Sequence, residues 1–561
     1  MILAINGKTE YRIEGEYEFA IKEFCDLFNK LTGAVLERAQ EDSDKLIKLG
    51  GVKPKDKGED AYVIRTEGDN LILSGNTNRG ILYAIYTFFE RYAGCRWFTS
   101  DCEYVPRKDE FTIPEINIDE SPFFWYRETF YKDAFEPSFA LRNKLNGHHM
   151  QLEREHGGKF EYGLGFVHTF HTIIPQEEYF KTHPEYFPMI DGERTTGPHH
   201  QICLSNPDVL KITIEKVKKA FDENPNVKIV SVSQNDTFEE GNQCRCDQCS
   251  AIEEEEGSPA GNVIRFVNSV ADAIKDEYPD KYIDTLAYRY TRKAPLKTKP
   301  RDNVIVRLCT IECCFSHPIT TCDQVNDKGV HRNGSFIEDI VAWSKIANNI
   351  FIWDYIVNFL NYLTPYPNLY ALQKNMQFFA EHNVKGVFSQ GCGEIKFSEY
   401  AHLRAYVIAK LLEDPYCDVN LIIDEFMYGY YQNAAAPLRK YIDVLNKKAE
   451  EENFHFGLYD DPNRDFLTKE FVDYADSLFD MAERMADDET ILYRVRRTRM
   501  SLRYAKLFLM DGSLEERRRE LEKFFEDLRY FKIESLLERG NLDSSYERMR
   551  QIVTPEDVER K

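Results

Sequence analysis

The chain has 561 residues and a formal net charge of −23; 42% of its residues are hydrophobic and 30% are charged. This is the balance of a soluble globular protein with two or three domains, and no apolar run reaches the roughly 18 residues that a membrane span needs. The negative charge argues against a nucleic-acid partner, because binding to phosphates requires a basic surface.

The start of the chain, MILAINGKTEYRIEGEYEF, has no basic segment followed by an apolar core, so we predict no secretory signal. The 13 cysteines are odd in number, and Cys313 and Cys314 are adjacent. Such a set favours reduced thiols over a disulfide framework. We therefore expect a cytoplasmic protein.

Residues 1–118 are predicted to form a small α/β domain. The segment AYVIRTEGDNLILSG (61–75) alternates like the two strands of a hairpin, with EGDN as its turn. The segment NRGILYAIYTFFERYAG (78–94) has apolar residues at helical spacing and ends at Gly94. A proline-bounded segment, residues 113–126, is predicted to lead into the second domain.

Residues 119–420 are predicted to alternate between short apolar strands and helices, which implies a parallel sheet with crossovers. Six strands with their exit loops are predicted at 123–131, 227–236, 282–290, 303–312, 349–359 and 384–394. Helices are predicted at 206–225, 260–279, 336–347 and 368–383.

These elements favour an α/β fold. Two further strands in the irregular region 140–200 would complete a (β/α)8 barrel of the TIM type. The alternative is an open doubly wound sheet, but no strand is followed by the glycine-rich phosphate turn typical of that fold. Residues 421–561 have apolar residues at i, i+3, i+4 spacing, and we predict a helical domain that packs against the barrel.

In such a barrel the catalytic residues lie where strands end and the following loops begin. Asp236 follows VKIVSVS, Glu312 ends NVIVRLCTIE, and Asp354 lies in NIFIWDY between two aromatic residues. Cleavage of a glycosidic bond requires one acid that protonates the leaving oxygen and a second group that stabilises the developing positive charge. We predict that Asp236, Glu312 and Asp354 are catalytic.

Two of these acids also have a structural interpretation. Asp236 at the start of a loop can cap a helix or form a turn, and Glu312 can pair with a nearby arginine. Asp354 is more informative, because an apolar neighbourhood raises the pKa of a carboxyl group and suits it to proton transfer.

Other residues near the strand ends are predicted to bind the substrate. His168 and His171 lie three residues apart without the acidic residue of a zincin motif, so we favour substrate binding over metal binding. The remaining predicted substrate-binding residues are Gln234, Asn235, Tyr288, Trp353, Tyr355 and Gln390.

Cys244, Cys246 and Cys249 have C-x-C-x-x-C spacing. Three thiolates this close can hold one structural zinc, but a closed site needs a fourth ligand that the local sequence does not offer. The alternative is free or partly oxidised thiols. A second group of cysteines is a candidate source of the fourth ligand: Cys309, Cys313, Cys314 and Cys322.

Six ordered motifs carry a resemblance to a known family: NRGILYAIYTFFERYAGCRWF, HPEYFPMIDGER, SVSQNDTFEEGNQCRCDQC, RLCTIECCFSHP, IFIWDYIVNFLNYLTPYPNL and VKGVFSQG. Together, from about residue 60 to about residue 440, they resemble a bacterial family long labelled as a domain of unknown function. That family is linked to glycoside hydrolase family 163, whose characterised members are endo-β-N-acetylglucosaminidases acting on N-glycans. The first domain resembles the non-catalytic α/β domain that precedes the barrel in β-hexosaminidases and α-glucuronidases.

The resemblance implies a (β/α)8 barrel and a retaining hydrolase in which the 2-acetamido oxygen of the substrate is the nucleophile. Asp236 and Glu312 match acidic positions of the family, and Asp354 and Tyr355 match its aromatic-acid motif. The characterised relatives are exported, whereas this chain shows no signal. An imported oligosaccharide or a short glycoside is therefore the expected substrate.

We expect a glycoside hydrolase that cleaves a β-linked N-acetylhexosamine or a related sugar and requires no cofactor. A second hypothesis is a retaining or inverting glycosidase that uses its own carboxylates on another sugar, such as a uronic acid. A third is a non-catalytic carbohydrate-binding protein. The expected partner is an oligosaccharide or glycoside, with no nucleic acid and no membrane, and a homo-oligomer is left open.

Overall fold

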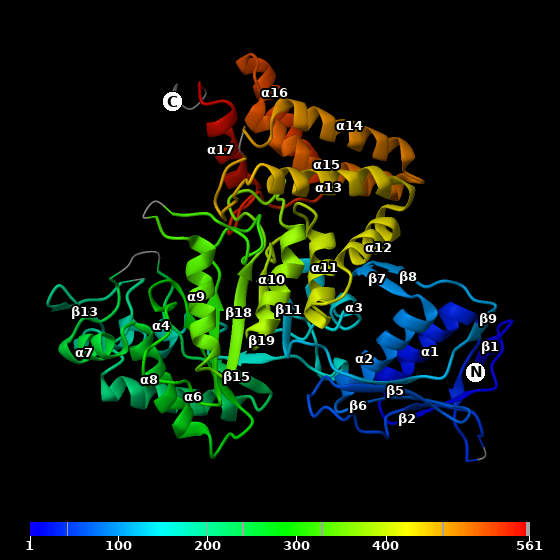
Figure 1. Cartoon of the computed structure of the whole chain (residues 1–561), viewed down its shortest axis with the longest axis horizontal. Coiled ribbons are helices and arrows are strands. Elements are labelled where there is room, and N and C mark those ends of the chain that lie inside the picture. Colours follow the sequence, from blue (N-terminus) through cyan, green and yellow to red (C-terminus); the bar gives the residue numbers. More distant parts are fainter. Residues whose placement is uncertain (42, 198, 238–240, 327–328, 463–464, 557–561) are drawn as a thin grey trace.

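The computed structural model describes residues 1–561 except 42, 198, 238–240, 327–328, 463–464 and 557–561. The N-terminal part lies beside a curled parallel sheet, and the C-terminal helices lie above that sheet in the view of Figure 1. Within the described residues, no helix combines the length and the apolar character needed to cross a membrane.

The N-terminal part contains a mixed sheet with the strand order β10-β5-β6-β4-β2-β3. The predicted hairpin is confirmed: β5 (Tyr62–Glu67) and β6 (Asn70–Gly75) are antiparallel, with Tyr62 opposite Gly75 and Glu67 opposite Asn70. The other strands of this sheet are β2 (Arg12–Gly15), β3 (Glu37–Arg38), β4 (Leu46–Leu49) and β10 (Asn117–Glu120).

The predicted helix that stops at Gly94 is also confirmed. α2 (Asn78–Phe88) starts where the Thr77 side chain accepts a hydrogen bond from Gly80 N–H, and it continues into a π-helical turn. Gly94 ends this turn with a φ of 83°, a left-handed conformation that glycine adopts without steric cost. α1 (Glu18–Thr32) lies next to α2, and their buried aromatic side chains form the core above the sheet.

The central part is a parallel sheet in the order β11-β19-β18-β17-β16-β15-β12. All six predicted strands are confirmed, and β12 is the one parallel strand found in the described part of region 140–200. The strands are β11 (Tyr126–Thr129), β12 (Glu161–Gly163), β15 (Val227–Ser231), β16 (Tyr282–Ala287), β17 (Val304–Cys309), β18 (Asn349–Tyr355) and β19 (Val384–Gln390).

Helices connect most of these strands, and the four predicted ones are confirmed. They are α6 (Pro207–Glu223), α8 (Ala260–Ile274), α9 (Arg332–Ser344) and α10 (Leu369–Glu381). Two further helices in this part of the chain are α7 (Asp247–Glu256) and α11 (Ala401–Glu413). Between β16 and β17 there is only a 3₁₀ turn, Arg289–Thr291. The intervening sequence contains Pro295 and Pro300, which disfavour a helix.

The complete (β/α)8 barrel is not confirmed, because seven parallel strands and no eighth are found among the described residues. A segment without strand structure lies between the two edge strands instead. Asn146 N–H donates to Arg127 O at 3.1 Å, and Asn146 O accepts from Phe160 N–H at 2.8 Å. The Asn146 side chain accepts from Arg127 N–H at 2.9 Å and donates to Trp125 O at 2.8 Å. One residue thus connects β11 to the start of β12.

The inside of the curled sheet is filled and does not form a pore. Aromatic side chains of several strands surround the buried Arg307, whose guanidinium carbon lies 4.5 Å from the centre of the Phe166 ring. Arg307 Nε is 3.2 Å from Asp284 Oδ2, so the buried charge is paired. This layer forms the floor below the carboxyl ends of the strands.

The described residues after 418 are mostly helical, as predicted. It consists of α12 (Val419–Tyr431), α13 (Ala435–Glu451), α14 (Lys469–Met485), α15 (Glu489–Leu509), α16 (Leu514–Tyr530) and α17 (Leu542–Val553). Loops of this region reach the carboxyl ends of the strands: Phe359 N–H donates to Leu458 O at 2.7 Å, and Glu538 N–H donates to Phe359 O at 2.8 Å.

Short elements complete the chain. β1 (Ile2–Ile5) pairs with β9 (Glu110–Thr112), β7 (Arg96–Thr99) with β8 (Cys102–Tyr104), and β13 (Met189–Ile190) with β14 (Glu193–Arg194). The short helices are α3 (Pro137–Ala140), α4 (Phe170–Ile173) and α5 (Gln176–Tyr179).

Candidate active site

A cavity of about 280 Å³ lies at the carboxyl ends of the parallel strands, and we call it the aromatic cavity. Predicted site residues from five strand ends line it: His168, Asp236, Tyr288, Trp353, Tyr355 and Gln390. Residues that were not predicted to be catalytic or to bind the substrate supply the rest: Phe130, His149, Phe166, Val167, Leu286, Cys309, Ile311, Phe359, Phe388, Glu394, Tyr459, Glu538 and Arg539. Rings on several sides and a few acids form a site suited to a sugar, whose ring faces are apolar and whose hydroxyl groups are polar.

Asp236 is the predicted catalytic acid that reaches this cavity. It lies five residues beyond Ser231, the last residue of β15, and its Oδ1 accepts a hydrogen bond from the Tyr288 hydroxyl at 3.2 Å. Its side chain is only partly buried, so a bound molecule can contact it.

The two amides before Asp236 hold the backbone of its loop. Gln234 Nε2 donates to Tyr288 O at 3.1 Å. Asn235 Nδ2 donates to His200 O at 2.7 Å, and Asn235 Oδ1 accepts from His171 N–H at 2.9 Å. Gln234 and Asn235 are buried, and neither they nor His171 line the aromatic cavity. These three predicted substrate-binding residues lie beside the site and position it.

His168 lies at the wall of the aromatic cavity with a defined tautomer. Its Nδ1 is 2.8 Å from Gln234 O, and because a carbonyl oxygen only accepts, Nδ1 carries the proton. Burial lowers the pKa of His168, which favours the neutral ring and leaves Nε2 as an acceptor. The residue has a φ of 56°, a left-handed conformation, and Ser233 Oγ accepts from its N–H at 2.8 Å.

A hydrogen-bonded chain crosses the cavity from β18 to the C-terminal region. Trp353 Nε1 donates to Gln390 Oε1 at 2.7 Å, and Gln390 Nε2 donates to Glu538 Oε1 at 3.3 Å. Burial raises the pKa of Glu538; nearby Glu394 and Asp236 raise it further, and Arg539 opposes this. Glu538 therefore favours the protonated form more than an ordinary glutamate, which suits it to donate a proton.

No sequence pattern pointed to Glu538 as a site residue. It lies between α16 and α17, almost 150 residues after its hydrogen-bond partner Gln390. Glu394 is the last residue of the segment predicted as a strand with its exit loop (384–394), but it was not predicted to be a site residue. Its Oε2 accepts from Arg539 N–H at 2.6 Å, which connects the β19 loop to the same C-terminal loop.

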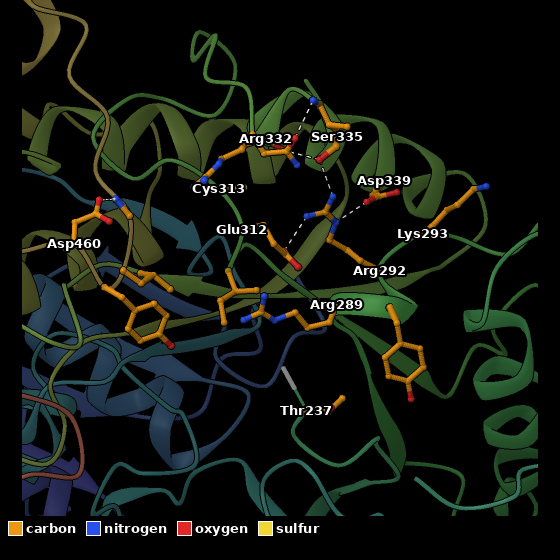
Figure 2. A pocket seen from close by; sticks show the side chains of 17 residues that line it. Thr237, Arg289, Arg292, Lys293, Glu312, Cys313, Arg332, Ser335, Asp339 and Asp460 are labelled. Carbon is orange, nitrogen blue, oxygen red and sulfur yellow. Dashed lines mark hydrogen bonds and ion pairs between the residues drawn. The ribbon is translucent and has the colours of Figure 1, made fainter. Parts of the chain in front are cut away.

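A second cavity of about 620 Å³, the polar cavity, adjoins the first, and Ile311 and Tyr459 line both. Glu312 lies here, its Oε2 2.9 Å from Arg292 Nη1. Figure 2 shows Arg292 between Glu312, Ser335 and Asp339. The structure therefore agrees with the alternative interpretation of Glu312 as the partner of an arginine.

Asp354 lines neither cavity. Successive side chains of a strand point to opposite faces, so Trp353 and Tyr355 face the aromatic cavity and Asp354 faces away. It is buried, and its Oδ1 accepts from the Thr310 hydroxyl at 2.9 Å. Burial raises the pKa of Asp354 to about 6. Asp236, Glu312 and Asp354, which we predicted to be catalytic, therefore do not line one common cavity.

The cysteines of the C-x-C-x-x-C motif form a cluster with a fourth thiol. The Sγ atoms of Cys203, Cys244, Cys246 and Cys249 lie within 4.8 Å of one another, and the distance from Cys203 Sγ to Cys246 Sγ is 3.8 Å. Four sulfurs around zinc, each bonded at about 2.3 Å, are about 3.8 Å apart, so the cluster fits a tetrahedral metal. All 13 cysteines are free of disulfide bonds.

The fourth thiol is Cys203, which precedes α6, and is not one of the cysteines between 309 and 322 that the sequence suggested. Two donors contact the cluster from outside: Met189 N–H lies 3.3 Å and Arg194 Nη1 3.5 Å from Cys244 Sγ. Such donors favour thiolates, the form that binds metal.

A family comparison identifies the chain. The model of a family described as "Domain of unknown function (DUF4838)" matches residues 97–443. The chain belongs to the DUF4838 family. The matched residues include the parallel sheet and every residue of the aromatic cavity except Tyr459, Glu538 and Arg539. No curated protein matches the chain.

Among solved structures, this DUF4838 protein is similar to a family 89 glycoside hydrolase from Clostridium perfringens in complex with 2-acetamido-1,2-dideoxynojirmycin. The TM-score is 0.51 and the identity 10%, over 91% of this chain and 65% of that chain. At this identity the likeness shows a shared fold.

Two further matches have lower TM-scores. A GH138 enzyme described as targeting pectin rhamnogalacturonan II has a TM-score of 0.45 and 10% identity, over 98% of this chain and 99% of that chain. CpGH84D has a TM-score of 0.46 and 11% identity, over 98% of this chain and 92% of that chain.

Proposed function

We propose that this protein is a glycoside hydrolase and that its reaction takes place in the aromatic cavity. The observation that carries the proposal is that Asp236 and Glu538, two of the three carboxyl groups that line the aromatic cavity, lie in one site with aromatic walls at the carboxyl ends of parallel strands; the third, Glu394, accepts a hydrogen bond from Arg539 N–H. Cleavage of a glycosidic bond needs two such groups on either side of the sugar. The fold shared with a glycoside hydrolase supports the proposal.

In this mechanism, Glu538 is the general acid, because its raised pKa favours the protonated form. It protonates the leaving oxygen. Asp236, oriented by the Tyr288 hydroxyl, faces the developing positive charge. Trp353 and Tyr355 provide apolar surfaces against the sugar ring.

The specific substrate we propose is a β-linked N-acetylhexosamine in an oligosaccharide or short glycoside. In a retaining, substrate-assisted route, the 2-acetamido oxygen attacks the sugar carbon, and Asp236 with Tyr288 holds the acetamide. We also propose that the protein is related to glycoside hydrolase family 163 and that it is located in the cytoplasm. The adjoining polar cavity would receive the rest of the substrate, since Ile311 and Tyr459 line both cavities.

One observation favours the uronic-acid alternative. The polar cavity is lined by four basic side chains, Arg289, Arg292, Lys293 and Arg332, against three acids, Glu312, Asp339 and Asp460. An anionic sugar next to the cleaved bond would find complementary charge there. Faster cleavage of aryl β-glucuronides than of aryl β-N-acetylglucosaminides would favour this alternative.

The test is an assay of aryl glycosides, including β-N-acetylglucosaminides, with the Asp236→Asn and Glu538→Gln variants. We expect each variant to lose roughly 10²–10⁴-fold in kcat on the substrate that the wild type cleaves. Glu534→Gln is the matched control, since Glu534 lies in the same loop with a 53% exposed side chain and outside the cavity. Inhibition by a thiazoline-type compound would support the substrate-assisted route.

Wild-type activity in both variants would refute the assignment. If the wild type cleaves no glycoside but calorimetry detects sugar binding, the non-catalytic alternative holds instead.

We also propose that Cys203, Cys244, Cys246 and Cys249 hold a structural zinc. The four thiols have the number, type and spacing of a closed tetrahedral site. None of them lines the aromatic cavity, so this zinc has no part in the reaction.

A further inference from the structure

A second group of metal-binding residue types lies apart from the four-thiol cluster. Cys314, His317 and Cys322 belong to the loop after β17, and His455 follows α13, 141 residues after Cys314. One ligand atom from each lies within 4.8 Å of the other three. Cys314 and His317 are buried, and Cys322 and His455 are partly buried.

The spacing of these atoms agrees with a tetrahedral metal. Cys314 Sγ is 3.5 Å from His317 Nδ1 and 3.4 Å from His455 Nδ1. Cys322 Sγ is 3.6 Å from His455 Nδ1. Zinc with bonds of about 2.3 Å to sulfur and about 2.05 Å to nitrogen places S and N about 3.6 Å apart at the tetrahedral angle.

Hydrogen bonds alone explain the arrangement less completely. Both sulfurs approach His455 Nδ1, but a neutral ring nitrogen has one lone pair and accepts one hydrogen. A metal at the centre accounts for all the short distances together.

The surroundings also match those of a metal-bound histidine. His455 directs Nδ1 toward the sulfurs, and its Nε2 lies 3.6 Å from Asp323 Oδ1. A ligand histidine commonly has its second ring nitrogen next to a carboxylate, which sets the tautomer and the ring orientation. Asn333 Oδ1 accepts from Cys314 N–H at 2.8 Å and so fixes the backbone of one ligand.

We propose that Cys314, His317, Cys322 and His455 form a second tetrahedral zinc site, which joins the loop after β17 to the segment after α13. Both segments line the cavities: Glu312 and Cys313 precede the first ligand, and Gly457 to Asp460 follow the last one closely. The zinc thereby sets the position of Tyr459, which lines both cavities. The site has a structural role and does not depend on which reaction the protein catalyses.

The experiment measures zinc by mass spectrometry in the full chain, purified without chelators. We expect two zinc ions per wild-type chain. Cys322→Ser and His455→Gln each reduce the content to one, and a variant with both Cys244→Ser and Cys246→Ser loses the other. Cys417→Ser is the matched control, because Cys417 is a partly buried cysteine outside both clusters, and it retains two.

Cobalt binding gives a readout that does not depend on how well each variant holds zinc. In the variant with Cys244→Ser and Cys246→Ser, Co²⁺ should give the intense visible bands of tetrahedral coordination and thiolate charge transfer from the two sulfurs of the second site. These bands should disappear when Cys322→Ser is added. Wild-type zinc content in both Cys322→Ser and His455→Gln, or Co²⁺ bands unchanged by the added Cys322→Ser substitution, would overturn the proposal.

Discussion

Asp354 has the most completely buried carboxyl group among the predicted catalytic residues, with 2% of the residue exposed. Its neighbours Trp353 and Tyr355 line the aromatic cavity, whereas Asp354 contacts Thr310 on the other face of the strand. The sequence predicted that Asp354 lies among apolar residues, and it is buried there; burial raises the pKa of Asp354 to about 6. A raised pKa therefore did not by itself identify a group that faces the substrate.

The pKa of Asp354 predicts a pH-dependent cost to stability. Its usual value is 3.8, and the folded value is about 6. Between these values the folded state binds the proton more strongly, so the contribution of Asp354 to stability falls as the pH rises through this window, and the cost is complete above pH 6. The difference corresponds to at most about 3 kcal/mol.

We expect Asp354→Asn to remove this cost. The thermal midpoint of the variant relative to the wild type should be higher at pH 8 than at pH 4.5, by several degrees. Differential scanning calorimetry at both pH values measures it. The same difference at both pH values, or a larger one at pH 4.5, would contradict the assignment.

At the scale of elements, the segment around Asn146 takes the place of a strand between β11 and β12. Its close approach to β11 depends on Gly147: a Cβ there would lie 2.1 Å from Glu128 Oε2 and 2.4 Å from Glu128 Cβ. Glu128 cannot move easily, because His149 Nδ1 lies 2.6 Å from its other oxygen and it is fully buried. Glycine is required here by space.

Gly147→Ala should lower the free energy of unfolding by about 1–3 kcal/mol, because the added methyl group has no room. Thermal unfolding measures the loss. Gly197→Ala is the control: the nearest atom to a Cβ at Gly197 is 3.6 Å away, so its midpoint should change little. An unchanged midpoint in Gly147→Ala would show that the segment does not hold the two edges together as described.

At the scale of the whole molecule, the C-terminal helices contribute to the site as well as to packing. Tyr459, Glu538 and Arg539 line the aromatic cavity, although they lie outside the residues that the family model matches. Backbone hydrogen bonds from Phe359 to Leu458 and from Glu538 to Phe359 hold both C-terminal loops against the loop after β18. The site is complete only when the helical region is folded onto the sheet.

Tyr459→Ala should therefore weaken substrate binding, with KM raised roughly five- to tenfold, because an aromatic contact of about 1 kcal/mol is lost. Steady-state kinetics on the substrate found in the glycoside assay measures it. Tyr474→Ala is a matched control: Tyr459 is 44% and Tyr474 45% exposed, but Tyr474 lies on α14 away from the cavities. An equal KM in both variants would argue against a role of the C-terminal region in binding.

Much of the secondary structure could be predicted from the sequence, because its signals are local. The hairpin at Tyr62–Gly75, the end of a helix at Gly94 and the capped start of α6 at Asn206 each depend on a few neighbouring residues. The six strands followed from short apolar runs, and Asp236, Tyr288, Trp353 and Gln390, which lie near their carboxyl ends, line the aromatic cavity.

Only the tertiary structure decided which side chains meet. Tyr355 and Asp354 are adjacent in β18, but Tyr355 lines the cavity and Asp354 lies on the opposite face of the strand. Because this strand is buried on both faces, its apolar sequence does not show which face is turned toward the cavity. Cys203, His455 and Glu538 come close to their partners from 43 to 148 residues away in the chain. Contacts between residues so far apart in the chain depend on how the sheet and the helices pack, and short sequence patterns do not specify that packing.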